Sequence, residues 1–140
     1  MKDNRVFIDT NIFIYTMLTE NLASEKRNKA VALMQSLSAK VVFINTQVLN
    51  EIYSVLLRHG VEEKNIQEKI EVIIRETRLS MIRLKTIRLC WELRIKYKFS
   101  YWDCLITASA LENQCAILYS EDMQHQQLIE QSLRIINPFE

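Results

Sequence analysis

Short apolar runs alternate with helical segments along all 140 residues, and this alternation limits the possible folds more than any other feature. The runs are residues 6–8, 41–44, 79–84, 116–119 and 133–136. Short strands that are apolar on both faces are typical of a parallel sheet buried between helices. The sequence therefore predicts an α/β fold of three layers, α/β/α, around a central, mostly parallel five-stranded sheet.

The segments between these runs have helical character. Helices are expected over 12–18, 23–37, 47–59, 62–77, 85–98 and 101–113, with a short helical piece near Gln126. Gly60 suits the end of the third of them, because glycine readily adopts the left-handed conformation that closes a helix. The length and the absence of a linker predict one domain over residues 1–140.

The composition excludes several classes of protein. With 1 Gly in the chain, neither a P-loop nor a dinucleotide-binding loop can be built, and few left-handed turns are expected. A net charge of +1 means that any nucleic-acid-binding surface must be local. The odd set Cys90, Cys104 and Cys115 is expected to be buried and reduced, as in a cytoplasmic protein. No run of about 18 apolar residues occurs, so no membrane span is expected.

Acidic residues follow the apolar runs at the positions where a parallel sheet binds its ligands. Ligands gather at the carboxyl ends of such strands. Asp9 ends the first run, Glu51 lies about two helical turns beyond the second, and Asp122 follows the fourth. Asp103 begins the helix before the fourth run. All four carboxylates are therefore predicted at one edge of the sheet.

Each of these residues also has a structural interpretation. Asp9 is equally well placed to cap the next helix, and Asp103 has capping-box spacing from Ser100. Glu51 lies at the edge of an apolar helical stripe and could face solvent. The loop with Glu121 and Asp122 is of ordinary polar composition, so only the set of four points to a site.

Electrostatics makes the set informative. Two carboxylates about 4 Å apart repel by roughly 4 kcal/mol at an effective dielectric constant near 20. A divalent cation removes this repulsion. Oxygen ligands without a cluster of Cys or His favour Mg²⁺ or Mn²⁺ over Zn²⁺, and such an ion can activate a bound water.

Four segments resemble the PIN-domain nucleases, especially the VapC-type bacterial toxins. They are Phe7-Ile8-Asp9-Thr10-Asn11-Ile12, Asn50-Glu51, Tyr101-Trp102-Asp103-Cys104-Leu105-Ile106-Thr107-Ala108 with Ala110, and Ser120-Glu121-Asp122-Met123. Their order and spacing agree with that family over nearly the whole chain.

The resemblance implies a PIN-like fold and Mg²⁺- or Mn²⁺-dependent hydrolysis of RNA by metal-activated water. It implies that Asp9, Glu51, Asp103 and Asp122 are the catalytic and metal-site residues. Asn11, Ser120 and Glu121 would support them, with Glu121 as the alternative to Asp122 for the last carboxylate of the site. It also implies a cytoplasmic toxin that dimerises and is restrained by an antitoxin protein. The apolar helices over 30–37 and 48–57 are expected to supply the dimer surface.

A run of basic residues precedes Asp103 and could hold RNA phosphates. It consists of Arg83, Lys85, Arg88, Arg94, Lys96 and Lys98. A solvated helix face is the alternative interpretation. Among the aromatic residues of this region, Phe99 and Trp102 are expected to pack in the core rather than to stack on bases.

Two other functions remain open from the sequence. One is a housekeeping PIN nuclease that processes RNA without an antitoxin. The other is a non-catalytic PIN fold that acts as a binding module.

Overall fold

The computed structural model describes residues 2–18 and 24–140. The strands are β1 (Arg5–Ile8), β2 (Val41–Asn45), β3 (Arg78–Ser80), β4 (Ile117–Tyr119), β5 (Leu128–Ile129) and β6 (Leu133–Ile136). The helices are a 3-10 turn η1 (Lys2–Asn4), α1 (Thr10–Met17), α2 (Ser24–Ser36), α3 (Thr46–Arg58), α4 (Glu63–Glu76), α5 (Leu84–Tyr97) and α6 (Tyr101–Glu112). The predicted start of the second helix, at residue 23, lies outside the described residues.

The strands form one sheet in the order β3-β2-β1-β4-β6-β5. Every pairing is parallel except that of β5 with β6. Phe7 of β1 pairs with Phe43 on one side and Leu118 on the other, and all three side chains are buried. The predicted α/β fold with a mostly parallel sheet is confirmed.

Within the described residues, the sheet has six strands where five were predicted. The extra strand is β5, in the region where a short helical piece near Gln126 was expected, and that prediction is wrong. Gln126 has a left-handed backbone with φ 72°, which ends any helical run. The third strand is also shorter than predicted, since Leu84 already begins α5.

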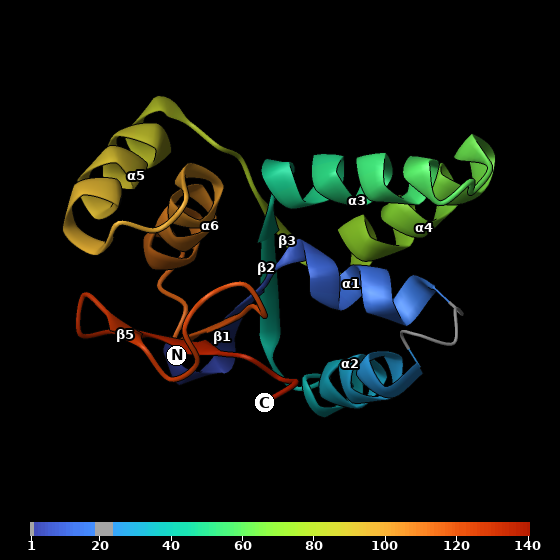
Figure 1. The fold of residues 1–140 in the computed structure, drawn as a ribbon, viewed down its shortest axis with the longest axis horizontal. Helices are drawn as coiled ribbons and strands as arrows, with labels where there is room; N and C mark the ends of the chain where they lie inside the picture. The colour runs from blue at the N-terminus through green and yellow to red at the C-terminus, as the bar shows by residue number, and fades with distance from the viewer. Residues whose placement is uncertain (1, 19–23) are drawn as a thin grey trace.

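The helices cover both faces of the sheet. Figure 1 shows α1 to α4 on one side and α5 with α6 on the other. Right-handed crossovers require this division, because the chain moves from β1 to β2 and β3 in one direction and then returns to β4 on the opposite side of β1. The strand order therefore reverses between β1 and β4, which is where open α/β sheets bind ligands.

Helices α2 and α3 bury their apolar side chains within this molecule. Ala30 of α2 and Leu37 just after it are buried, as are Val48, Ile52 and Leu56 of α3. These side chains pack in the core, whereas Leu57, at the end of the range expected to form a dimer surface, is 44% exposed. The exposed large hydrophobic residues concentrate instead between residues 81 and 102.

The structure also describes the three cysteines and the lengths of the helices. All three cysteines are buried and unpaired, as predicted. Within residues 2–18 and 24–140, no helix has the length and apolar character needed to cross a membrane.

Candidate active site

Asp9 lies at the carboxyl end of β1 and is the N-cap residue of α1. One carboxylate oxygen, Oδ1, accepts a hydrogen bond from the backbone N–H of Thr10 at 2.7 Å. The other, Oδ2, accepts from the hydroxyl of Ser120 at 2.9 Å. The backbone N–H of Asp9 donates to the carbonyl of Tyr119, which joins β1 to β4 at this point. The side chain is thereby held in one orientation.

Asp122 reaches the same place from the loop after β4. Its backbone N–H donates to the Ser120 hydroxyl at 3.2 Å, so Ser120 links the loop to Asp9. The amide Nδ2 of Asn11 donates to Asp122 Oδ2 at 3.5 Å. Both Asn11 and Ser120 thus lie against the acidic residues that they were expected to support.

Asp103 approaches from the helical layer of α5 and α6, in the first turn of α6. Ser100 caps this helix, because its hydroxyl accepts from the Asp103 backbone N–H. Asn45, which is fully buried at the end of β2, holds the middle of α6 in the core. Its side-chain amide donates to the Ser109 hydroxyl at 2.8 Å. Asn45 also caps α3 by accepting from the Val48 N–H. It was not singled out from the sequence.

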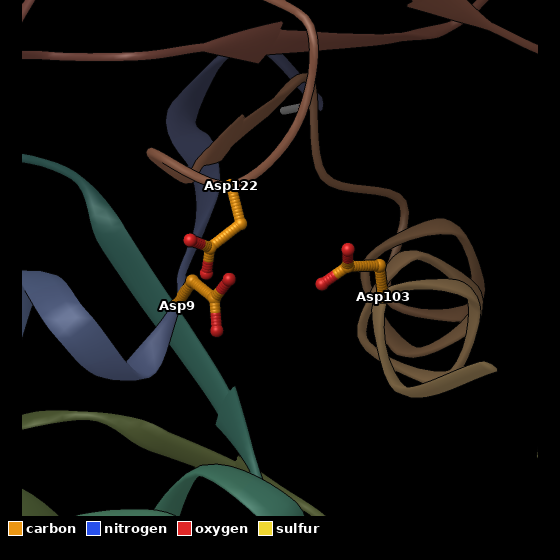
Figure 2. A group of neighbouring side chains, drawn as sticks. All are labelled: Asp9, Asp103 and Asp122. Carbon is orange, nitrogen blue, oxygen red and sulfur yellow. The ribbon is translucent and has the colours of Figure 1, made fainter. Parts of the chain in front are cut away.

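Asp9, Asp103 and Asp122 form one acidic cluster. Each offers an oxygen, and these three oxygens lie within 4.8 Å of one another. Figure 2 shows Asp9 and Asp122 side by side, with Asp103 directed toward them from its helix. Among the described residues, no Lys or Arg forms an ion pair with any of the three.

The cluster is electrostatically strained in the absence of a cation. Burial raises the pKa of Asp9 to about 7, against the hydrogen bonds from Thr10 and Ser120, and the charges of Asp122 and Glu51 raise it further. Burial, followed by the charge of Asp103, raises the pKa of Asp122. The pKa of Asp103 is also raised by burial. Three hard oxygen donors with this unmet repulsion fit a divalent cation such as Mg²⁺.

Glu51 lies beside the cluster but is not one of the three converging carboxylates. Its Oε1 accepts from the Thr10 hydroxyl at 3.0 Å and from Gln47 Nε2 at 3.2 Å. Thr10 therefore connects Glu51 with the neighbouring Asp9. Of the four predicted carboxylates, three therefore converge, and the fourth, that of Glu51, lies beside them.

Glu121 and Asp122 are adjacent in sequence yet have different surroundings. Glu121 accepts from the Tyr15 hydroxyl at 2.7 Å and forms an ion pair with Lys26 at 2.8 Å. It is therefore directed toward α1 and α2, whereas Asp122 belongs to the acidic cluster. Lys26 and Tyr15 give no signal in the sequence, because the contact joins segments far apart in the chain.

The six predicted basic residues are all exposed, on α5 and the segments beside it. Lys85 lies 3.8 Å from Glu112, and Lys96 pairs with Glu130. The other four, Arg83, Arg88, Arg94 and Lys98, form no ion pair with a described residue. None of the six forms an ion pair with Asp9, Asp103 or Asp122, all of them described residues.

Comparison with known proteins identifies the family. The model of the PIN domain matches residues 6–130, so the chain belongs to the PIN domain family. No curated protein matches the sequence. The resemblance noted from the four sequence segments is confirmed.

Solved structures share the fold at low sequence identity. VapC20 of Mycobacterium tuberculosis, a toxin that cleaves the sarcin–ricin loop, has a TM-score of 0.65 and 18% identity over 81% of this chain and 86% of its own. A toxin–antitoxin complex from Klebsiella pneumoniae has a TM-score of 0.69 and 18% identity, covering 95% and 97%. VapBC2 of Rickettsia felis, bound to promoter DNA, has a TM-score of 0.69 and 15% identity, covering 95% and 99%.

Proposed function

We propose that this protein is an Mg²⁺- or Mn²⁺-dependent endoribonuclease. The observation that carries the proposal is the acidic cluster of Asp9, Asp103 and Asp122 at the strand-order reversal of a PIN domain. These three residues would hold the ion. When bound, the ion supplies a water of lowered pKa and neutralises charge on a phosphodiester.

The residues around the cluster have supporting roles in this proposal. Ser120 and Asn11 orient the Asp9 and Asp122 carboxylates through the hydrogen bonds described above. Glu51 completes the site from α3, where it accepts the hydrogen bond from the Thr10 hydroxyl. Glu121 ties the loop to Lys26, which holds the neighbouring Asp122 in position.

RNA is the proposed substrate. The exposed basic residues on α5 and beside it would hold its phosphates by charge, with Arg83, Arg88, Arg94 and Lys98 free of ion pairs to described residues. We further propose that the protein is the toxin of a toxin–antitoxin pair and forms a homodimer. The fold similarity to VapC20 and to toxin–antitoxin complexes supports the toxin role.

An RNA-cleavage assay with Mg²⁺ or Mn²⁺ tests the enzymatic proposal. Asp9→Asn should abolish cleavage, because it removes a ligand charge and retains the shape of the side chain. Asp3→Asn is the matched control, since Asp3 is exposed and precedes the opposite end of β1. Equal cleavage by wild type and Asp9→Asn would contradict the mechanism. No cleavage by the wild type would favour a binding module.

Growth assays test the partner. Expression of the wild type, but not of Asp9→Asn, should arrest growth of a host cell. Co-expression of a small protein encoded beside this gene should relieve the arrest. A wild type that cleaves RNA without affecting growth would favour a housekeeping nuclease.

A further inference from the structure

A pocket of about 420 Å³ lies next to the acidic cluster, between α3 and α6. Such a volume is within the range of about 300 to 1,000 Å³ that is usual for small-ligand sites. In Figure 1 these helices flank the end of β2, one on each side. Glu51 lines the pocket and also contacts Thr10 beside Asp9, so the pocket and the cluster adjoin.

Trp102 forms the aromatic wall of this pocket. It is 62% exposed, so the expectation that it packs in the core is wrong. Leu105 and Ile82 add apolar surface. Successive residues of a helix point in directions about 100° apart. The side chain of Trp102 can therefore line the pocket while that of Asp103 belongs to the adjoining acidic cluster.

The α3 wall is polar and includes an unsatisfied acceptor. The Nε2–H of Gln47 donates a hydrogen bond to the carboxylate of Glu51. The Oε1 atom of Gln47 is buried and has no hydrogen-bond partner among the described residues. A buried acceptor without a donor is unfavourable. Asn50, one helical turn along, adds a second amide to the same wall. The pocket therefore offers hydrogen bonds to a ligand that carries an N–H group.

The charge of the pocket excludes a phosphate as its ligand. No Lys or Arg is among the described residues that line it, and the one charged residue is Glu51. A neutral, planar group with N–H donors is the ligand that an indole face and two amides complement.

We infer that this pocket is a nucleobase subsite, in which a base next to the cleaved phosphodiester stacks on Trp102 and meets the amides of Gln47 and Asn50. The inference rests on the proposed ribonuclease function, because it is the position of the acidic cluster that brings an RNA strand to the pocket. The subsite gives the enzyme a preference for sequence on one side of the cut, while the basic residues bind the backbone of any RNA.

Tryptophan fluorescence tests the subsite without any cleavage. The chain has 2 Trp, so Trp91→Phe leaves Trp102 as the only reporter and Trp102→Phe leaves Trp91. Trp91 is the matched control because it is 51% exposed on α5 and does not line the pocket. A short single-stranded RNA, added in EDTA, should quench the Trp102 reporter and not the Trp91 reporter. Equal quenching of both, or none of Trp102, overturns the inference.

Cleavage kinetics test the same residue when the metal is present. Trp102→Ala should lower kcat/KM on single-stranded RNA by about tenfold, with Trp102→Phe restoring most of it, since stacking requires only an aromatic face. Gln47→Leu should alter which base is found beside the cut. Trp91→Ala should cleave as the wild type does.

The cleavage assays distinguish a wrong subsite inference from a wrong nuclease proposal. If the wild type cleaves RNA and Trp102→Ala cleaves it equally fast with the same base pattern, the subsite is overturned and the nuclease remains. If nothing cleaves, the nuclease proposal fails, and the quenching experiment still decides whether Trp102 binds a base. Dissociation of a dimer by Trp102→Ala, measured by light scattering, would instead assign this face to a second copy of the chain and overturn the inference.

Discussion

Asp9 uses its two carboxylate oxygens for different contacts, one with the Thr10 backbone and one with the Ser120 hydroxyl. It is therefore a helix cap and a member of the acidic cluster at once. The two interpretations open from the sequence do not compete, because the cap fixes the direction in which the charge is presented. Burial opposes that charge and raises the pKa of Asp9 to about 7.

The raised pKa of Asp9 predicts how stability depends on pH. An unfolded Asp has a pKa of about 3.9, so between pH 4 and 7 the folded, metal-free protein retains a proton that the unfolded chain has lost. The contribution of Asp9 to stability is complete below about pH 4 and is lost as pH rises through about 7. The free energy of unfolding in EDTA should therefore fall over this window, by at most about 1.4 kcal/mol per pH unit from this group.

Denaturant unfolding of wild type and Asp9→Asn from pH 4 to 8 measures this effect. The Asn variant should lose a large part of the slope, because it has no proton to release. Asp3→Asn, at an exposed position, should keep the wild-type slope. Identical slopes for wild type and Asp9→Asn would contradict the burial argument.

At the scale of elements, the hairpin of β5 and β6 turns through left-handed residues other than glycine, although a chain with one Gly was expected to have few such turns. The turn contains Glu130 with φ 49° and Gln131 with φ 56°, and the N–H of Ser132 donates to the carbonyl of Ile129. Few left-handed positions were expected, yet five residues other than glycine adopt them in the part of the chain that the structure describes. The Lys96 and Tyr97 side chains, which bond Glu130, help to hold this turn.

The hairpin turn predicts a stabilising substitution. Gln131→Gly should raise the free energy of unfolding by about 0.5 to 1 kcal/mol, because glycine relieves the left-handed strain at a position without side-chain hydrogen bonds among those described. Gln124→Gly is the control, since Gln124 is exposed and its φ is not positive; it should destabilise. Thermal unfolding of both variants makes the comparison, and equal effects would contradict it.

Elements differed in how well the sequence predicted them. The β1, β2, β4 and β6 strands were recognised because their apolar runs match a buried parallel strand. The two residues of β5 carry no such pattern, since Leu128 is exposed and only Ile129 is buried. Its position depends on pairing with β6, which local sequence does not encode.

At the scale of the whole molecule, the acidic cluster joins the sheet to one of its two helical layers. Asp9 and Asp122 belong to the sheet edge, and Asp103 belongs to α6 on the far face from α1 to α4 (Figures 1 and 2). An ion bound by all three exists only in the folded state. Binding should therefore stabilise the entire protein.

Mg²⁺ should raise the unfolding temperature of the wild type in proportion to the logarithm of its concentration above Kd. At 100 times Kd the gain is about 2.7 kcal/mol. Asp9→Asn and Asp103→Asn should show little of this increase, whereas Asp3→Asn should show all of it. Scanning calorimetry with Mg²⁺ and with Mn²⁺ makes the measurement. An unfolding temperature that neither ion changes would contradict the metal site.

The sequence by itself determined the layered α/β fold, because periodic apolar runs specify which faces are buried. It also indicated that acidic residues gather at one sheet edge, because all parallel strands end there. Only the tertiary structure decided that Asp122, not Glu121, joins Asp9 and Asp103, and that Glu51 lies to one side. It also decided that Trp102 is exposed. Local sequence does not encode these outcomes, because they depend on packing partners far apart in the chain, such as Lys26 for Glu121.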